Sequence, residues 1–310
     1  MRKPTLSDVA RAAGVSQGTV SNVYNRPNVV RPALREAVLA AARQLGYGGP
    51  APSGRALRRG RANLIAVVSD ESTAYMLADP YGRRLLGGVA SVCDAQGIGL
   101  TVASTHGTGS ARNGEGWSID TALADGFILY CYEDDAAVAA QARARGLPMV
   151  TVDTGRMAGQ GSVAIDERAA ARAAAEHLLD LGHRRFGVLS LELAADLRPG
   201  PVDAARLATA RYSGTRRRID GYRGALRAAG LDPDALAIYE TLNDRDTAEA
   251  GLAWLLGRAE PPTALLTLSD VLALHACDWL AANGLKVPRD VSVVGFDDTP
   301  EAAQATPPLT

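Results

Sequence analysis

The N-terminal sequence contains the segment TLSDVARAAGVSQGTVSNV (residues 5–23), which predicts two short helices joined by a tight turn. Thr5 or Ser7 offers a hydroxyl that caps the first helix by accepting a bond from a free backbone N–H. Apolar residues then recur at helical spacing. Gly14 ends this helix, because glycine adopts a left-handed backbone without a Cβ penalty. Ser16 caps the second helix, and together these signals predict a helix-turn-helix.

The second helix turns Val20 and Val23 inward and leaves short polar side chains outside, with no acidic group among them. Amides and hydroxyls of this kind read base edges in the DNA major groove. The alternative is a small helical hairpin that packs on another part of the protein. We favour a DNA-reading helix because the turn chemistry and the polar outer face agree. The candidate DNA-binding residues here are Thr5, Ser16, Gln17, Gly18, Thr19, Ser21, Asn22 and Asn25.

The net charge of −1 for 310 residues hides a strong asymmetry. Residues 1–61 contain eleven Lys or Arg and two Asp or Glu, a net charge of +9, so the remainder carries −10. A basic head on an acidic body indicates a polyanionic partner for the head alone. The charge distribution therefore favours nucleic acid as that partner.

A third helix and a basic linker follow the opening segment. Pro32 starts a helix with an apolar stripe, which closes a three-helix domain over residues 1–47. Residues 48–62 begin with GGPAPSG and form a linker. Within this linker Leu57 stands alone among arginines. Either Leu57 wedges between base steps in the minor groove or the segment is a solvated basic tether, and the residues alone leave both open.

From residue 63 onward, short apolar runs alternate with amphipathic helices. This rhythm is typical of parallel, doubly wound α/β sheets. It is repeated in two halves of residues 63–310 with a boundary near 153–163, which predicts a body of two lobes. Ligands of such sheets bind beyond the carboxyl ends of the strands, so a cleft between the lobes is the expected binding site.

Several classes of protein are disfavoured by what the sequence lacks. Three widely spaced cysteines predict a reducing compartment, and the expected location is the cytoplasm because neither a signal peptide nor a run of about 18 apolar residues is present. No cofactor is expected, and the four histidines lack the spacing of metal ligands. No GxSxG or phosphate-loop motif indicates an enzyme. A transport binding protein would share the two lobes, but it would be exported and lack the basic head.

The sequence resembles the LacI/GalR family of bacterial transcription regulators along essentially its whole length. The resemblance rests on several ordered motifs: TLSDVA and GVS with TVS in the opening segment, RAL (55–57), LGHRR (181–185), RIDGY (218–222) and PRDVSVVGFDD (288–298). It implies a helix-turn-helix head and a periplasmic-binding-protein-like body. It further implies a homodimeric repressor that binds a palindromic double-stranded DNA operator and is controlled by a small molecule, a sugar, bound between the lobes.

The resemblance also implies roles for individual residues. Arg55 and Leu57 match a hinge helix that forms on DNA, where the leucine intercalates. The effector-binding candidates are Tyr81, Tyr130, Asp153, Arg218, Asp246, Ser269 and Asp297. Each aspartate at a strand–helix turn has a plainer explanation as a helix N-cap. We favour capping for Asp270 and Asp298, and ligand contact for Asp153, Arg218 and Asp297.

Two features depart from the family pattern. The connection from Ala194 to Gly214 is longer than usual, and Asp203–Arg211 within it resembles an added helix that either covers the cleft mouth or forms a mobile flap. Family members also continue some tens of residues beyond the position of Thr310, through a strand and helix that complete the first lobe. Either the sequence is truncated at this point or the lobe is built differently, and a missing strand would leave an open sheet edge and an exposed apolar face.

Overall fold

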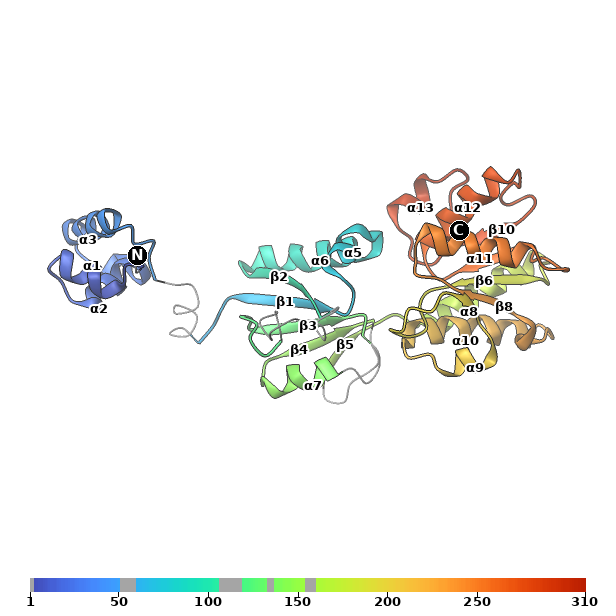
Figure 1. Cartoon of the computed structure of the whole chain (residues 1–310), viewed down its shortest axis with the longest axis horizontal. Coiled ribbons are helices and arrows are strands. Elements are labelled where there is room, and N and C mark those ends of the chain that lie inside the picture. Colours follow the sequence, from blue (N-terminus) through green and yellow to red (C-terminus); the bar gives the residue numbers. More distant parts are fainter. Residues whose placement is uncertain (1–2, 51–59, 106–118, 133–136, 154–159) are drawn as a thin grey trace. The chain divides into compact units, whose positions relative to one another are not determined.

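The computed structural model describes residues 3–50, 60–105, 119–132, 137–153 and 160–310. The chain divides into two units, Met1–Asn63 and Leu64–Thr310, each with hydrophobic clusters of its own (Figure 1). Arg55 and Leu57, the two predicted hinge residues, lie outside the described residues.

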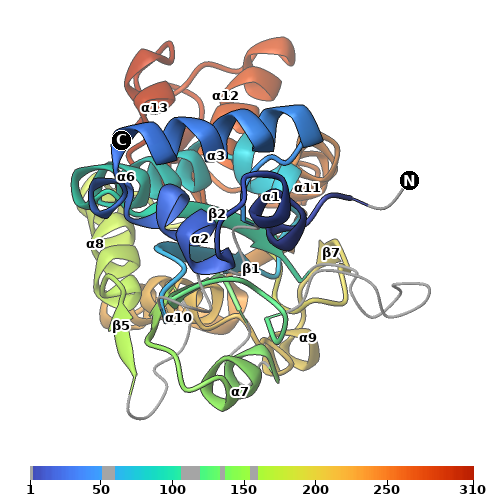
Figure 2. The ribbon, with the colours of Figure 1, turned by 90° about the vertical axis from the view of Figure 1, so that its left-hand side faces the viewer.

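Within residues 3–50, the N-terminal unit contains three helices, which Figure 2 labels. They are α1 (Leu6–Ala12), α2 (Gln17–Asn25) and α3 (Pro32–Leu45), with the 3-10 turn η1 (Pro27–Val29) before α3. Thr5 is the cap of α1: its hydroxyl accepts a bond from the Asp8 N–H, and the Asp8 carboxylate accepts one from the Thr5 N–H. Ser16 caps α2 by accepting a bond from the Thr19 N–H at 3.1 Å. The helices close on a small core of Val9, Ala10, Val20, Val23, Val38, Ala41 and Ala42. The predicted helix-turn-helix is therefore confirmed.

The first lobe of the second unit is a five-stranded parallel sheet with strand order β2-β1-β3-β4-β5. Helices α5 and α6 lie on one side of it and α7 on the other (Figure 1). Val67 packs in a cluster with Leu86 of α6, whereas its neighbour Val68 packs in one with Val138 of α7. The elements are β1 (Leu64–Ser69), α5 (Thr73–Ala78), α6 (Pro80–Gln96), β2 (Gly99–Ser104), β3 (Gly126–Tyr130), α7 (Ala137–Ala144), β4 (Met149–Val152) and β5 (Gly161–Val163).

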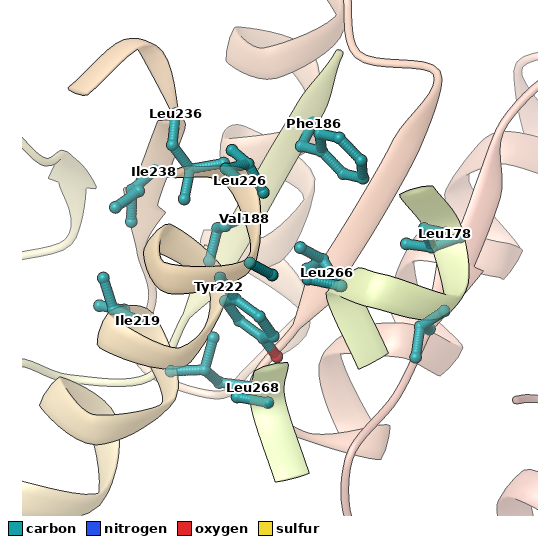
Figure 3. Packing of buried hydrophobic residues seen from close by; sticks show 14 of the residues in the cluster. Leu178, Phe186, Val188, Ile219, Tyr222, Leu226, Leu236, Ile238, Leu266 and Leu268 are labelled. Atoms are coloured by element: carbon teal, nitrogen blue, oxygen red, sulfur yellow. The ribbon is translucent and has the colours of Figure 1, made fainter. Parts of the chain in front are cut away.

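The second lobe repeats the plan with strand order β10-β9-β6-β8-β7, parallel except for β7. Helices α8 and α10 cover one face and α11 and α12 the other. Figure 3 shows Ile219, Tyr222 and Leu226 of α10 among buried side chains that include Val188 and Leu266 of the sheet. The elements are α8 (Glu167–Asp180), β6 (Phe186–Ser190), β7 (Gly200–Pro201), α9 (Ala204–Ala208), α10 (Ser213–Ala228), η3 (Pro233–Ala235), β8 (Ala237–Glu240), α11 (Arg245–Leu256), β9 (Ala264–Thr267), α12 (Asp270–Ala282), β10 (Ser292–Val294) and α13 (Pro300–Gln304). The predicted two-lobed α/β body is confirmed.

Some element boundaries differ from those that the sequence predicts. The apolar run Val291–Phe296 has the composition of one buried strand, but β10 ends at Val294. Beyond it the N–H of Gly295 donates to the Thr310 carbonyl, and the N–H of Phe296 donates to a side-chain carboxylate. Backbone groups that bond elsewhere cannot continue a sheet ladder. Helices α5 and α13 were not predicted, because their five or six residues are too short to show a helical period.

The long connection from Ala194 to Gly214 contains the predicted added helix, α9, which Asp203 caps. Arg206 of α9 contacts Asp196 and Glu240, with N–O distances of 2.7 Å to each, and the Glu240 side chain is 1% exposed. An arginine held bidentately by a buried carboxylate has a well-defined geometry. These contacts favour a connection fixed to strand β8 over a mobile flap.

An apolar groove runs along one face of the first lobe, between α6 and strands β3, β4 and β5. Val92, Val150 and Val163 are exposed there, Val163 by 61%. The exposed apolar face expected for this lobe is thus present among the described residues.

Candidate functional site

Helix α2 presents a polar outer surface on the N-terminal unit. Gln17, Gly18 and Asn22 are exposed, while Thr19 and Ser21 are half-buried. Gly18 has open space around its Cα apart from the Ser16 hydroxyl, so the backbone of the helix is accessible at this point. The absence of bulk and of negative charge on this surface permits close approach to a phosphate-lined groove.

Several of the predicted DNA-binding side chains already make hydrogen bonds within the head, and Thr5, Ser16 and Asn25 are among them. The hydroxyls of Thr5 and Ser16 cap α1 and α2. The Asn25 side-chain amide donates to the carbonyl and hydroxyl oxygens of Ser21, at 2.9 and 3.1 Å. These bonds assign the three residues a structural role in shaping the helix-turn-helix. Their contact with DNA stays a prediction.

A cleft of about 110 Å³ lies in the second unit, lined by both lobes. Its walls come from segments that follow strand carboxyl ends: β1, β3 and β4 of the first lobe and β6, β8, β9 and β10 of the second. Six of the seven predicted effector residues meet there. They are Tyr81, Tyr130, Asp153, Arg218, Ser269 and Asp297.

Asp246 is the predicted residue that the structure places elsewhere. It lies in the first turn of α11, exposed, and does not line the cleft. Asn243 takes that place, three residues nearer to the end of β8. Asn243 has a positive φ of 52°, which asparagine tolerates better than most residues. The sequence-based choice was wrong because it favoured a carboxylate over the residue at the strand end.

Arg218 is the central cation of the cleft and is almost completely enclosed. Its Nε donates to Glu167 at 2.5 Å, and a second nitrogen donates to the Leu268 carbonyl oxygen. The guanidinium lies 3.7 Å above the centre of the Phe296 ring and 3.9 Å from an Asp297 oxygen. A cation so held is pre-oriented, because Glu167 and the aromatic ring leave it little freedom.

Asp297 owes its position to the buried carboxylate of Asp270. That carboxylate accepts bonds from the N–H groups of Phe296, Asp297 and Thr299 and from the Thr299 hydroxyl, at 2.7–3.3 Å. Asp297 in turn accepts a bond from the Asp270 N–H at 3.0 Å. Burial raises the pKa of Asp297 to about 6, against the lowering effect of Arg218.

The preference for Asp270 and Asp298 as helix caps was wrong. Ser269 caps α12 through the Leu272 N–H, and Asp270 instead organises the loop after β10. Asp298 precedes the cap of α13, has a φ of 51°, and its carbonyl accepts a bond from Arg84. Both residues therefore bind backbone or side-chain partners far away in sequence, which local patterns do not reveal.

In the first lobe, Asp153 and two tyrosines form a second polar group. The Tyr81 hydroxyl donates to the Asp153 carboxylate, and the rings of Tyr81 and Tyr130 stack with centroids 6.3 Å apart. Burial raises the pKa of Asp153, while the bond from Tyr81 lowers it. Stacked rings beside carboxylate oxygens provide both an apolar surface and hydrogen-bond acceptors for a polar ligand.

One chain of hydrogen bonds crosses between the lobes. The Ser269 hydroxyl donates to Asn243 at 2.6 Å, and the Asn243 amide donates to the Tyr75 hydroxyl of α5 at 2.6 Å. Arg83 of α6 adds an ion pair to Glu301 at 2.7 Å. The relative position of the two lobes is thus coupled to residues of the cleft itself.

Sequence reasoning missed several polar residues that line the cleft, among them Glu71, Tyr75, Glu167, Glu192, Tyr212 and Asn243. A simple positional signal was available for two of them. Glu71 and Glu192 each lie two residues beyond the end of a strand, β1 and β6. Tyr75 and Tyr212 have no such signal, because a short helix and the added connection bring them in.

Glu192 is expected to destabilise the ligand-free protein above neutral pH. Burial, helped by the negative charge of Glu71, raises the pKa of its carboxyl to about 7. A carboxyl with a raised pKa favours folding below its unfolded pKa, and this contribution is lost as the pH rises through the folded pKa. Glu192→Gln is therefore expected to be about 3 kcal/mol more stable than the wild type at pH 8, and equally stable near pH 4.5.

Urea denaturation at the two pH values measures this difference. Glu260→Gln is the control, since Glu260 is an exposed glutamate outside the cleft. Equal stabilities of the wild type and Glu192→Gln at pH 8 would contradict the assignment.

Known proteins show the same architecture. A model of the family described as "Bacterial regulatory proteins, lacI family" matches residues 5–49, and one described as "Periplasmic binding protein-like domain" matches residues 175–310. An HTH-type transcriptional regulator of Mycobacterium tuberculosis is 40% identical over 303 residues, covering 97% of this chain and 84% of that protein. The ribose operon repressor of Escherichia coli is 30% identical over 311 residues, covering 99% and 86%.

Solved structures agree with these relatives. The CelR–cellobiose complex, from a transcriptional regulator, is 30% identical, covers 99% of this chain and 86% of that one, and has a TM-score of 0.63. The lac repressor dimer bound to operator and an anti-inducer is 26% identical, covers 100% and 87%, and has a TM-score of 0.70.

Two further observations bear on other classes of protein. In the described part of the chain, no helix combines the length and the apolar character needed to cross a membrane. Among the same residues, no group of three or more His, Cys, Asp or Glu side chains is placed to hold a metal ion. A helix-turn-helix head, a two-lobed body and relatives that match both over nearly the whole chain all lead to one assignment. The chain belongs to the LacI family of bacterial regulatory proteins, which are DNA-binding regulators of transcription.

Proposed function

We propose that this regulator binds a palindromic operator as a homodimer, represses transcription in the cytoplasm, and changes its operator affinity when a sugar binds between the lobes. The polar outer surface of α2, on a head whose residues 1–61 carry +9, is the observation that supports DNA reading. Two such heads are needed to read the two halves of a palindrome. The lac repressor neighbour, a dimer on its operator, supports this arrangement.

The cleft supports a polyhydroxylated effector. Carboxylate oxygens of Asp153 and Asp297 accept hydrogen bonds from hydroxyl groups, and the guanidinium of Arg218 donates them. The stacked rings of Tyr81 and Tyr130 provide an apolar surface for a sugar ring. Two relatives are named for sugars, the ribose operon repressor and the CelR–cellobiose complex.

Control of DNA binding follows from linkage between the cleft and the lobe arrangement. Tyr75–Asn243 and Arg83–Glu301 already connect the lobes beside the cleft. A ligand that contacts both walls stabilises one lobe arrangement over another by its difference in affinity. In a dimer that change alters the spacing of the two segments leading to the heads, and with it the affinity for the operator.

Leu57 has the largest proposed role outside the described residues. Leu57→Ala is expected to weaken binding to the operator by about 10- to 100-fold, because an apolar wedge at the operator centre supports the bent DNA. Binding to unrelated DNA, which depends on phosphate contacts, is expected to stay nearly unchanged. The operator is first selected from genomic fragments with the full-length protein, and both affinities are then measured by gel shift at one salt concentration.

Leu181→Ala serves as the matched control, since Leu181 is a leucine of the body that is 63% exposed. Equal losses of specific and nonspecific binding in Leu57→Ala would refute the wedge. Failure of the wild type to select any common sequence would refute the proposed operator.

A further inference from the structure

The cleft between the lobes carries far more negative than positive charge. Among its described lining residues, Arg218 is the single cation. The carboxylates number six, on both lobes, and they are Glu71, Asp79, Asp153, Glu167, Glu192 and Asp297. A neutral ligand would leave these negative charges uncompensated. Their mutual repulsion is strong because the charges lie close together in a partly enclosed space.

Arg218 is held by its immediate partners and offsets only part of the imbalance, although its charge also lowers the pKa of Asp153. Its guanidinium donates to Glu167 and to the Leu268 carbonyl, its face is covered by Phe296, and Asp297 lies at 3.9 Å. Glu167 is 3% exposed and its charge is matched there. Helix α6 stabilises a third carboxylate, Asp79, whose side chain accepts a bond from the Gly82 N–H at 2.6 Å.

The four carboxylates other than Glu167 and Asp79 stand on opposite walls, and one of them, Asp297, also lies near Arg218. Glu71 and Asp153 belong to the first lobe, and Glu192 and Asp297 to the second. The pKa of Glu192 is raised by burial and by the negative charges of Glu71, Glu240 and Asp244. Carboxylates that repel each other across a cleft are relieved by a cation bound between them. An ammonium group, with three donors and one positive charge, matches such acceptors.

The aromatic residues of the cleft fit the same ligand. Tyr75, Tyr81, Tyr130 and Tyr212 line it, together with the amide of Asn243. Tyrosine rings attract cations through their faces, and their hydroxyls bond to the hydroxyl groups of a polyol. A simple metal cation would not need the ring faces, whereas an organic cation packs against them.

We propose that the effector of this cleft is an amino sugar, a polyhydroxylated ligand whose ammonium group lies between the carboxylates of the two lobes. This inference rests on the proposed function, because it names the ligand class of the same cleft. The ammonium contacts Glu71 or Asp153 on one wall and Glu192 or Asp297 on the other, so its charge draws the lobes together. The sugar hydroxyls bond to Arg218, Asn243 and the tyrosines.

Matched probes test the charge directly. Glucosamine, galactosamine and mannosamine are compared with their neutral parents glucose, galactose and mannose by calorimetry and thermal shift on the full-length protein at pH 7. At least one amino sugar is expected to bind about tenfold more tightly than its parent or more, and to raise the melting temperature. Its N-acetyl derivative, which keeps the ring but loses the charge, is expected to bind as weakly as the parent.

Other outcomes overturn the inference. A neutral sugar that binds as tightly as its amino counterpart overturns the amino-sugar inference. If that neutral sugar also changes the affinity for the operator, the proposed sugar-controlled repressor stands. Absence of binding by all three amino sugars also overturns the amino-sugar inference. Putrescine, a charged probe without hydroxyls, would overturn the polyol part if it binds as tightly as the best amino sugar.

Variants locate the charge in the cleft. Glu192→Gln is expected to lower the affinity for the amino sugar by about tenfold and to change the affinity for the neutral parent much less, so that the preference for the amino sugar falls. Glu260→Gln, in an exposed glutamate outside the cleft, is expected to leave both unchanged. If Glu192→Gln and Glu260→Gln behave alike, the preference for an amine does not come from this cleft and the inference fails.

Discussion

Arg218→Ala is expected to lower the free energy of unfolding of the body by about 3–5 kcal/mol. The substitution leaves the Glu167 carboxylate, 3% exposed, without its guanidinium partner. It also removes the donor to the Leu268 carbonyl and the cation above the Phe296 ring. The measurement is urea denaturation of the full-length protein at neutral pH, followed through the signal of the body.

A double variant separates the effect of Arg218 on stability from its effect on the response to effector. Arg218→Met with Glu167→Gln removes both charges at similar volume, so we expect a stability close to that of the wild type. Operator binding is expected to persist, because the head has its own core, whereas the response to effector is lost. A double variant that still responds normally would refute the role of Arg218 in the cleft.

A surface arginine supplies the control. Arg168 on α8 pairs with Asp220 at 2.8 Å, but its side chain is 62% exposed. Exposed ion pairs contribute little, so Arg168→Ala is expected to cost less than about 1 kcal/mol. An equal loss of stability in Arg168→Ala and Arg218→Ala would contradict the buried-pair argument.

Gly295→Ala is expected to destabilise the second lobe by about 3 kcal/mol or more and to weaken effector binding at the same time. A Cβ at this position would collide with the Asp270 carboxylate. That carboxylate holds the backbone of Phe296, Asp297 and Thr299, so the collision displaces the loop that carries Asp297. Unfolding in urea and calorimetric binding of the effector measure the two losses.

Gly224→Ala is the matched control for Gly295→Ala. Gly224 lies inside α10, and a Cβ there would meet no atom within 4 Å. Alanine has the higher helix propensity, so we expect this variant to be as stable as the wild type or more stable by up to about 1 kcal/mol. If Gly295→Ala is as stable as Gly224→Ala, the Asp270 carboxylate adapts to the new Cβ without loss of stability, and the prediction is wrong.

The positions of the cleft residues were partly predictable from local sequence. Asp153 and Asp297 follow buried apolar runs, and the carboxyl ends of parallel strands meet at one edge of a sheet. The rule agrees with the resemblance, which named both as effector-binding candidates together with Ser269 and Tyr130, and all four line the cleft. It also applies to Glu71 and Glu192, where the strand end was recognised but the following carboxylate was overlooked.

Other assignments failed because their partners are distant in sequence. Asp270 looked like a helix cap, yet its partners lie 26–29 residues away. Asp246 and Asn243 both follow β8, and only the backbone turn at Asn243 decides which side chain enters the cleft. The charge of Glu192 depends on burial, which a one-dimensional pattern does not report.

The sequence by itself determined the helix-turn-helix, the basic head on an acidic body, and the alternation of strands and helices. These features depend on caps, glycine turns, apolar period and charge, all of which are local. The opening segment also determined which face of α2 stays polar. Only the tertiary structure decided the rest: the enclosure of Arg218 by Glu167 and Phe296, the loop held by Asp270, and the surplus of carboxylates in the cleft. These arise where strands and helices far apart in the chain meet, because burial and electrostatic repulsion depend on distance in space and not on distance along the sequence.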